Sequence, residues 1–405
     1  MFKNFKNIIK ACICDYNYRN KLKKIKKYPE DKKIRVLFYV TENQKWGYQS
    51  LYEVLSGDDK FEVFVVVGIL TDVHKGKDFT RKNLEENYQF FKSRNMNVEY
   101  GYKENQYVDL KEFEPDIVFY EQPWGLPKKH SPYNVSKYAL TYSSPYSFQI
   151  FDYKDDYKQN FHRHLYKYLV TSDINISRFE GYQKGSSKNC LNINYLKLDN
   201  YFDNASALNT NWKDPQKIKI IYAPHHSFSN DSMNMATFRE NGKLILDCAK
   251  SQSETTWIFK PHPQFKYALI SNNIMSEKEI EEYYNEWSQI GVIYTQGDYF
   301  DIFKTSDLMI TDCCSFLGEY FLTKKPIIRP VKRGSTPLNK LGQEIVKGYY
   351  ETYDNEELLD TILRLLNNEN DYKKAIREQI IESQSCFGER GSLKVYESIK
   401  NLIAR

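Results

Sequence analysis

Histidine and lysine side chains follow two short apolar segments in the second half of the chain. Residues 217–222 (KIKIIY) lead into Ala-Pro-His225-His226-Ser, and residues 256–260 (TWIFK) end in Lys260 and continue as Pro-His262-Pro. The prolines restrict the backbone on either side of these residues. The imidazole of His262, between two prolines, is therefore held in a defined direction, and Lys260 supplies a fixed positive charge. Side chains of these types can bind an anion and transfer protons.

A third segment combines small and acidic residues where a strand passes into a helix. It reads Asp-Leu-Met-Ile-Thr311-Asp312-Cys-Cys314-Ser315-Phe-Leu-Gly-Glu319. Unpaired backbone N–H groups and the dipole at a helix start bind anions such as phosphate. Glu319 lies one turn after Ser315 on the same helix face, where a carboxylate suits a ribose hydroxyl or a base amino group. Ser315 equally fits a simple N-cap, and the two roles are compatible.

The elements that carry these residues alternate between strands and helices. Short runs rich in β-branched and aromatic residues, such as 34–40 (IRVLFYV) and 61–67 (FEVFVVV), are typical of parallel strands buried on both faces. A βαβ series results and predicts doubly wound α/β domains. Ligands of such sheets bind outside the carboxyl ends of the strands, which is where the three segments lie. Further strands are predicted at 98–100, 116–120, 139–142, 168–171, 217–222, 256–260, 292–294, 307–310 and 326–331.

Helices are predicted between these strands, and two close the chain at 355–367 and about 372–404. A polar stretch, 198–214, is the best linker. We therefore expect a leader at 1–33, an N-terminal domain at 34–205 and a C-terminal domain at 206–405, whose last helix could pack back on the N-terminal domain.

Composition excludes several classes of protein. The chain has 405 residues, of which 41% are apolar and 16% aromatic, enough for a buried core. The longest apolar run, 63–70, is far short of the roughly 20 residues of a membrane-spanning helix. There is no Gly-rich phosphate loop, no HExxH and no paired CxxC, so no metal or cofactor is expected. The seven cysteines are expected to be reduced, in the cytoplasm.

The positive charge is concentrated at the N-terminus. Residues 1–35 hold twelve basic and three acidic side chains, a net charge of +9, whereas the whole chain carries only +5. The rest of the chain is slightly acidic and has no basic stripe, which argues against a nucleic-acid partner.

Together, four motifs of the second half resemble the C-terminal half of the CDP-glycerol glycerophosphotransferase family, whose members build teichoic acids and related polyol-phosphate polymers. The motifs are YAPHH, KPHP, TDCCSFLGE and the following KKP. The motifs keep the family order over about residues 220–330. The resemblance implies two facing Rossmann-like domains of the glycosyltransferase-B type. It implies a CDP-alcohol donor in the C-terminal domain and an acceptor in the N-terminal one.

The resemblance also implies roles for individual residues. His262 is expected to contact the donor pyrophosphate, Ser315 to bind phosphate and Glu319 to bind the nucleoside. The remaining residues assigned to the donor side are His225 as a catalytic candidate, with Lys260, His226, Thr311, Asp312 and Cys314 in binding roles.

The N-terminal half departs from the family pattern. Where relatives carry a WHGTPLK loop, whose histidine resembles a catalytic base, residues 138–148 contain no histidine. Glu121, His130, Tyr142 and His225 remain candidates for the base. Glu121, or a tyrosine of the 142–146 loop, is favoured on the acceptor side.

We therefore predict an enzyme that transfers glycerol phosphate or ribitol phosphate from a CDP-alcohol to a hydroxyl of a cell-surface glycan or polymer and releases CMP. The alternatives are a sugar transferase of the same architecture that uses a nucleotide sugar, and a non-catalytic surface-binding protein. The basic leader, residues 1–33, is interpreted as an anchor to an anionic membrane, on the inner face of the cell membrane and near a lipid-linked acceptor. A solvated tail is the other interpretation.

Overall fold

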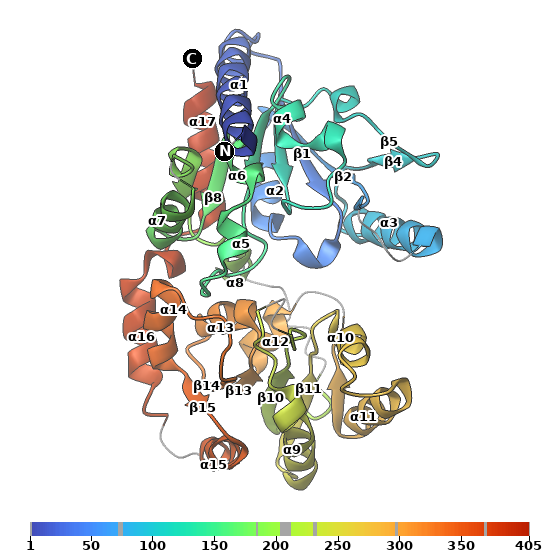
Figure 1. Ribbon diagram of the computed structural model, residues 1–405, viewed down its shortest axis with the longest axis vertical. Coiled ribbons are helices and arrows are strands. Elements are labelled where there is room, and N and C mark those ends of the chain that lie inside the picture. The colour runs from blue at the N-terminus through green and yellow to red at the C-terminus, as the bar shows by residue number, and fades with distance from the viewer. Residues whose placement is uncertain are drawn as a thin grey trace. The chain divides into compact units, whose positions relative to one another are not determined.

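The computed structural model describes residues 2–71, 76–183, 185–202, 212–229, 233–295, 299–367 and 371–404. The chain forms two compact units (Figure 1). Unit 1 comprises Met1–Tyr146, Lys154–Phe202 and Glu389–Arg405, and unit 2 comprises Ser147–Tyr153 and Asp203–Gly388. The boundary predicted between residues 205 and 206 falls in 203–211, outside the described residues.

Unit 1 is built on a parallel sheet of seven strands in the order β3-β2-β1-β6-β7-β8-β9. The apolar runs that predicted strands at 34–40 and 61–67 form two neighbouring strands inside the sheet, and both faces of these strands are buried. The strands are β1 (Ile34–Val40), β2 (Phe61–Val67), β3 (Val98–Tyr100), β6 (Ile117–Tyr120), β7 (Leu140–Ser143), β8 (Lys167–Val170) and β9 (Cys190–Asn192).

Helices surround this sheet. They are α1 (Phe2–Ile25), α2 (Gln49–Ser56), α3 (Gly76–Lys92), α4 (Pro132–Val135), α5 (Lys154–Tyr157), α6 (Asn160–Arg163), α7 (Asp173–Tyr182), α8 (Asp199–Phe202) and α17 (Gly391–Ile403). A small hairpin joins β4 (Tyr102–Lys103) to β5 (Gln106–Tyr107), and one-turn 3-10 helices occupy Asn43–Lys45, Leu110–Phe113, Lys128–His130, Ser187–Asn189 and Leu196–Leu198.

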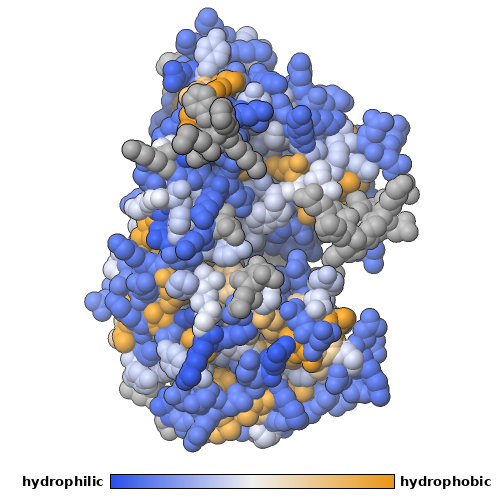
Figure 2. Space-filling view, in the orientation of Figure 1, coloured by the Kyte–Doolittle hydropathy of each residue, from blue (hydrophilic) through white to orange (hydrophobic). Residues whose placement is uncertain are grey.

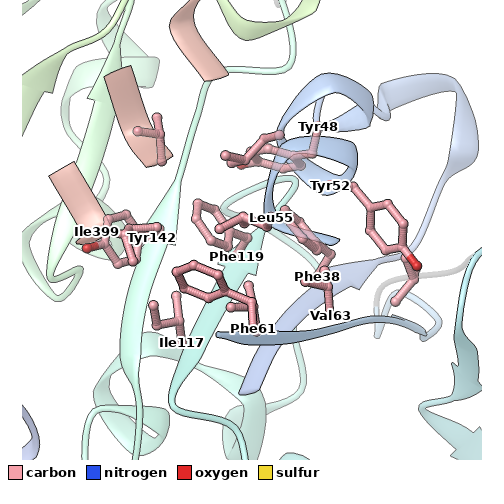
Figure 3. Packing of buried hydrophobic residues seen from close by; sticks show 14 of the residues in the cluster. Phe38, Tyr48, Tyr52, Leu55, Phe61, Val63, Ile117, Phe119, Tyr142 and Ile399 are labelled. Atoms are coloured by element: carbon pink, nitrogen blue, oxygen red, sulfur yellow. The ribbon is translucent and has the colours of Figure 1, made fainter. Parts of the chain in front are cut away.

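Aromatic side chains fill the core of unit 1 (Figure 3). The ring of Phe119 stacks between Phe38, at a centroid distance of 4.8 Å, and Tyr142, at 5.0 Å. These three residues come from neighbouring strands β1, β6 and β7. The aromatic layer therefore ties together the strands whose carboxyl ends carry the candidate residues of this unit.

The basic leader is part of this core rather than a separate tail. Cys14, Tyr18 and Ile25 of α1 are buried in the same cluster as the sheet residues. Lys21 forms a 2.7 Å ion pair with the buried Asp116, and the Tyr18 hydroxyl contacts Thr141. The interpretation of the leader as a solvated tail is wrong, because one face of this helix covers the sheet.

Unit 2 holds a second parallel sheet, with six strands in the order β12-β11-β10-β13-β14-β15. The strands are β10 (Ile218–Ala223), β11 (Thr255–Phe259), β12 (Gly291–Ile293), β13 (Leu308–Thr311), β14 (Ile327–Pro330) and β15 (Tyr350–Thr352). The helices are α9 (Phe238–Ser251), α10 (Phe265–Ser271), α11 (Glu277–Ile290), α12 (Phe300–Thr305), α13 (Cys314–Phe321), α14 (Lys340–Ile345), α15 (Asn355–Leu366) and α16 (Lys374–Ser383), with 3-10 turns at Val346–Gly348 and Ser385–Phe387. Two Rossmann-like α/β domains were predicted, and this fold class is confirmed.

The single helix predicted over residues 372–404 is wrong. The chain forms α16, a 3-10 turn and then α17, which belongs to unit 1. The carboxylate of Asp199 accepts hydrogen bonds from the N–H groups of Gly391 (2.9 Å) and Ser392 (2.7 Å) and so caps the start of α17. The capping residue is about 190 positions away in sequence, so the local helical pattern did not reveal the break.

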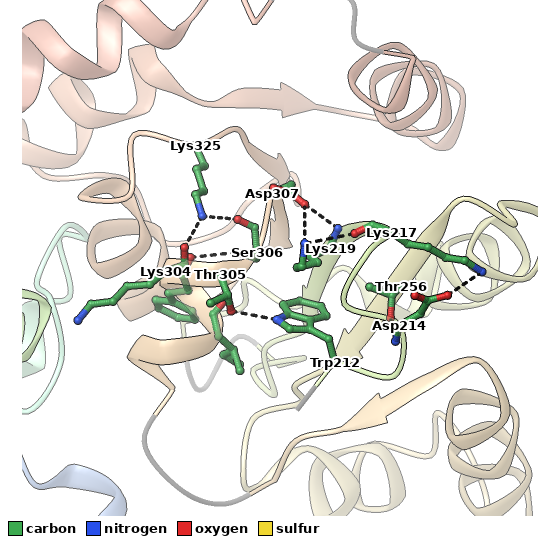
Figure 4. Close-up of polar contacts among 12 residues, drawn as sticks. Trp212, Asp214, Lys217, Lys219, Thr256, Lys304, Thr305, Ser306, Asp307 and Lys325 are labelled. Atoms are coloured by element: carbon green, nitrogen blue, oxygen red, sulfur yellow. Dashed lines mark hydrogen bonds and ion pairs between the residues drawn. The ribbon is translucent and has the colours of Figure 1, made fainter. Parts of the chain in front are cut away.

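Polar contacts stabilise the amino-terminal edge of the unit 2 sheet (Figure 4). The Nζ of Lys325 donates to the carbonyls of Lys304, at 2.6 Å, and Ser306. Lys325 therefore caps the carboxyl end of α12. The KKP motif, although part of the family resemblance, has a structural role here, because this end of β13 is opposite the edge where ligands bind.

Candidate active site

Three loops meet at the carboxyl edge of the unit 2 sheet. Strands β11, β10 and β13 are neighbours and run parallel, so the segments that follow them lie side by side. The N–H of Lys260 donates to the carbonyl of Tyr222 (2.8 Å), and the N–H of His262 donates to the carbonyl of Pro224 (3.2 Å). Sheet pairing therefore extends past the strands and fixes the two histidine loops against each other.

The three imidazoles of these loops form one cluster. The ring of His226 stacks on that of His262 at a centroid distance of 3.9 Å and lies 4.4 Å from that of His225. His225 is buried, and the other two are partly exposed. The structure therefore brings together the three histidines that the sequence separates by up to 37 positions.

Burial favours the neutral form of His225 and His226. It lowers the pKa of His225 well below its usual value and that of His226 to about 4, because a charged imidazole loses its hydration in this environment. The Nδ1 of His226 is buried and has no hydrogen-bond partner among the described residues. Neutral rings can donate or accept one hydrogen bond at each nitrogen, so the cluster offers both donors and acceptors to a ligand.

Asp312 and Thr311 support the loops. Both carboxylate oxygens of Asp312 are occupied: one accepts from the N–H of His225 (2.7 Å), the other from the N–H and hydroxyl of Thr237 (2.7 and 2.8 Å). The Thr311 hydroxyl donates to the carbonyl of Ala223 (2.7 Å) and accepts from the N–H of Cys313 (3.0 Å). Both side chains are buried and bonded to the loops, which indicates a supporting role; their assignment to substrate binding stays a prediction.

Helix α13 starts at the same edge, directly after β13. Cys314 and Ser315 form its first turn and are half-buried, with the sulfur and hydroxyl 3.9 Å apart. Glu319, one turn later, is fully buried and accepts a 2.6 Å hydrogen bond from the hydroxyl of Tyr299. The helix start is thus positioned as predicted, and Tyr299 is a partner of Glu319 that sequence reasoning missed.

Aromatic rings surround Lys260. Its side chain is 9% exposed, and Nζ lies over the rings of Tyr299 (5.0 Å), Phe316 (5.3 Å) and Tyr294 (5.4 Å). Cation–π attraction holds the ammonium group in place. Tyr294 follows β12 as Lys260 follows β11, so its position after a strand was the signal that could have identified it.

A small pocket in unit 1 contains Glu121, which follows β6. The carboxylate accepts hydrogen bonds through Oε2 from the N–H groups of Thr41 (3.0 Å) and Glu42 (3.2 Å). Oε1 is buried and has no partner among the described residues. The pocket is lined by Lys45, Gly47, Tyr48, Glu121, Ser144, Pro145, Tyr146, Leu196 and Lys197.

Burial raises the pKa of Glu121 to about 8, and the charge of Lys45 together with the hydrogen bond from the Thr41 N–H opposes this shift. Lys45 also lies over the rings of Trp124 (5.2 Å) and Tyr146 (5.3 Å). A carboxyl group with a pKa near the operating pH is suited to proton transfer. This pocket therefore combines a candidate base with a cation and two aromatic rings.

Two other candidates for the base do not reach a ligand. Tyr142 is 1% exposed, and its hydroxyl is buried in the core of unit 1 without a partner among the described residues. The ring of His130 packs against Tyr39 and Tyr107, and its Nε2 contacts the carbonyl of Val108 at 2.7 Å. The burial of its hydroxyl argues against Tyr142 as a catalytic residue, and that assignment stays a prediction. Of the favoured 142–146 loop, Tyr146 is the tyrosine that lines the pocket.

Comparison with known proteins supports the resemblance. Residues 147–332, which include the histidine loops and α13, match the family described as CDP-Glycerol:Poly(glycerophosphate) glycerophosphotransferase. This match covers less than half of the chain, and it supports the family suspected from the motifs over these residues. No curated protein sequence matches the chain.

Solved structures share the fold. The wall teichoic acid polymerase TagF is 13% identical with a TM-score of 0.55, and the match covers 100% of this chain and 98% of that one. The UDP-GlcNAc 2-epimerase from Neisseria meningitidis, bound to UDP-GlcNAc, is 12% identical (TM-score 0.58; 91% and 100% covered). The S. aureus MnaA–UDP structure is 14% identical (TM-score 0.57; 92% and 98% covered). At these identities the likeness establishes the fold.

Proposed function

We propose, from the match of residues 147–332 to the glycerophosphotransferase family, that this protein transfers an alditol phosphate from a CDP-alcohol to a hydroxyl of a cell-surface glycan or polyol-phosphate polymer. The alditol is glycerol or ribitol. The attacking hydroxyl forms a new O–P bond to the distal phosphorus, the bond from that phosphorus to the bridging oxygen breaks, and CMP leaves.

The donor is assigned to the carboxyl edge of the unit 2 sheet. His262 and the α13 start, at Cys314 and Ser315, donate hydrogen bonds to the pyrophosphate, and Lys260 adds positive charge. These groups offset the charge that develops on the bridging oxygen when CMP leaves. Positioning and electrostatic stabilisation account for most of the catalysis of phosphoryl transfer.

The acceptor is assigned to the pocket of unit 1. Glu121 removes the proton of the attacking hydroxyl through Oε1, the oxygen left without a partner by the surrounding described residues. Trp124 and Tyr146 offer aromatic faces, on which the C–H surface of a sugar or polyol can pack.

One observation carries the proposal. Within the segment that matches the family, three adjacent parallel strands deliver two histidine loops and a helix start to one edge of a sheet. Binding of a CDP-alcohol, which carries a pyrophosphate, needs these groups close together. If the histidines had only a structural role, they would not need to lie at the same edge.

The test is release of CMP from CDP-glycerol and, separately, from CDP-ribitol, in the presence of a glycan or polyol-phosphate acceptor. The proposal expects CMP release that depends on the acceptor, with one donor preferred. Binding of neither CDP-alcohol in a thermal-shift panel would overturn it.

A nucleotide-sugar transferase is the second candidate, because two of the structures with this fold were determined with UDP-GlcNAc or UDP. The same thermal-shift panel includes UDP-sugars. Stabilisation by a UDP-sugar alone, with release of UDP, would select this candidate.

We further propose that α1 binds an anionic membrane surface from the cytoplasmic side. While one face of α1 is buried, Ile8, Ile9, Ile13 and Tyr16 are exposed among lysines. Figure 2 shows an apolar patch in the part of the visible face that α1 occupies. Among the described residues, no helix is long and apolar enough to cross a bilayer.

Sedimentation with liposomes tests this membrane proposal. Binding to anionic vesicles that weakens at high salt is expected, since each lysine near the surface contributes about 1 kcal/mol. Replacement of Ile9 and Ile13 by Ser should weaken binding without unfolding the helix, whose buried face is unchanged. Salt-independent binding, or none, would contradict the proposal.

A further inference from the structure

The imidazole cluster of unit 2 also has the composition of a metal site. One ring nitrogen from each of His225, His226 and His262 lies within 4.8 Å of the others. Three imidazole nitrogens bound to one zinc ion at about 2.0–2.1 Å are about 3.4 Å apart in a tetrahedral arrangement. To reach this separation, the imidazole nitrogens must move closer together through rotation of the side chains.

We propose that His225, His226 and His262 bind a divalent transition-metal ion of the zinc type, with one coordination position left open. Imidazole ligands suit Zn²⁺, Co²⁺ and Ni²⁺, whereas Mg²⁺ and Ca²⁺ prefer oxygen. Three histidines and an open position are the ligand set of a catalytic rather than a structural zinc site. This site departs from the expectation that the protein uses no metal.

The backbone holds the histidine loops as a metal site requires. Asp312 accepts the N–H of His225 at 2.7 Å, and the N–H of His262 is bonded to the carbonyl of Pro224. The Nδ1 of His225 lies 2.7 Å from the Ser227 hydroxyl, which also accepts the N–H of Met235 at 3.1 Å. The same Nδ1 accepts the backbone N–H of Ser227 at 3.3 Å. Metal binding through Nε2 therefore requires a change to the tautomer in which Nδ1–H donates to the Ser227 hydroxyl. Such outer contacts orient metal-binding histidines.

A bound ion would also satisfy an uncompensated polar atom. The Nδ1 of His226 is buried without a hydrogen-bond partner among the described residues, which is costly in a protein interior. Metal ligation replaces the missing partner.

Binding would change the arrangement of the rings. His226 and His262 stack with 22° between their planes, and the in-plane lone pairs of two stacked rings cannot meet at one ion. One ring must turn about its Cβ–Cγ bond. If His262 turns, its Nδ1 loses the 3.1 Å hydrogen bond from the N–H of Gln264. This hydrogen bond is exposed, so water can take the place of the imidazole as its acceptor.

The open position gives the ion a function that rests on the proposed CDP-alcohol reaction. The cluster lies at the same edge as the α13 start, so a pyrophosphate oxygen of the donor can occupy the fourth position. The ion then adds to the charge stabilisation that Lys260 and the helix start supply.

Titration of the metal-stripped full-length protein with Co²⁺ tests the site. Co²⁺ bound to nitrogen ligands in a tetrahedral site gives visible absorption bands, which Zn²⁺ abolishes by displacement. We expect one equivalent to bind, and we expect His226→Ala and His262→Ala each to weaken binding at least tenfold. Gln264→Ala, on the same loop, retains its backbone N–H and should bind Co²⁺ as the wild type does.

Three outcomes would overturn the metal site: no visible bands up to millimolar Co²⁺, unchanged binding in both histidine variants, or a near-ultraviolet thiolate band that places the ion on a cysteine. The readout does not depend on catalysis. Failure of the proposed function is seen separately, as absence of acceptor-dependent CMP release from protein supplied with Zn²⁺.

Discussion

The carboxyl edge of the unit 2 sheet and the pocket of unit 1 present two different ways to hold a reactive group after a parallel strand. In unit 2, three neighbouring strands each contribute a loop, and buried side chains such as Asp312 use every oxygen to fix the loops. In unit 1, one carboxylate is desolvated, and one of its oxygens has no partner among the described residues.

We infer that the edge of unit 2, the proposed donor site, depends on shared positioning of its groups. The pocket of unit 1, the proposed acceptor site, depends instead on the ionisation of one buried carboxyl group. Loss of a single contact on the donor side leaves its neighbours in place. Loss of the Glu121 carboxylate leaves the pocket without its base. The two regions should therefore respond differently to substitution.

The largest effect is expected from Glu121→Gln. The amide oxygen can still accept the N–H groups of Thr41 and Glu42, so the pocket keeps its structure, but the variant cannot remove a proton. We expect kcat to fall by about 10²–10⁴-fold, with unchanged affinity for the CDP-alcohol. Steady-state CMP release and calorimetric donor binding measure the two quantities, and a kcat within tenfold of the wild type would exclude Glu121 as the base.

His262→Ala should have the next largest effect, about 10²–10³-fold on kcat/KM, the range for removal of one donor that stabilises a transition state. Donor affinity should fall as well, in contrast to Glu121→Gln. Gln264→Ala is the matched control on the same loop and should behave as the wild type. If His262→Ala turned over as fast as the wild type, the assignment of the CDP-alcohol site to this edge of the sheet would be contradicted.

The pH dependence of stability separates the two regions further. The pKa of Glu121 is raised from 4.5 to about 8 in the folded protein, so the folded state binds a proton that the unfolded state has already released between these values. Stability from this group is complete below about pH 4.5 and declines as pH rises to about 8, by about 1.4 kcal/mol per pH unit.

Glu121→Gln removes this decline because the amide does not titrate. Relative to the wild type, its melting temperature should rise between pH 5 and pH 8 and then level off. If the difference in melting temperature between the two proteins stays constant across this pH window, the carboxyl group is not desolvated. The difference in melting temperature between Gln264→Ala and the wild type should not change with pH, because this variant keeps the Glu121 carboxyl group.

The sequence located the loops of unit 2 better than the pocket of unit 1 for a physical reason. Both faces of the parallel strands are buried, so strands such as 61–67 and the loops after them could be located from apolar runs. The loops then converge because neighbouring strands are parallel. The side chain of Asp312 is bonded to Thr237, and that of Thr311 to Ala223. These partners come from other elements of the fold, so the sequence could not show that Thr311 and Asp312 support the loops.

The direction of a side chain on a doubly buried strand was also beyond the sequence. Tyr142 lies on β7 and stacks on Phe119 in the core, whereas Tyr146 lies after the end of this strand and lines the pocket. With no alternation of polar and apolar residues, the pattern does not say which face each residue takes. The helix of residues 2–25 was missed for a related reason, since its buried residues are interrupted by lysines.

The smallest effect is expected from Tyr142→Phe, and it tests the limit of the acceptor site. The hydroxyl is buried without a hydrogen-bond partner among the described residues, so its removal takes away no contact and relieves the desolvation of a polar group. We expect an unchanged kcat and a melting temperature equal to or slightly above that of the wild type. Tyr146→Phe keeps the ring that lines the pocket and is the companion variant. A loss of activity in Tyr142→Phe alone would mean that the core opens during turnover and that the base is not confined to the pocket of Glu121.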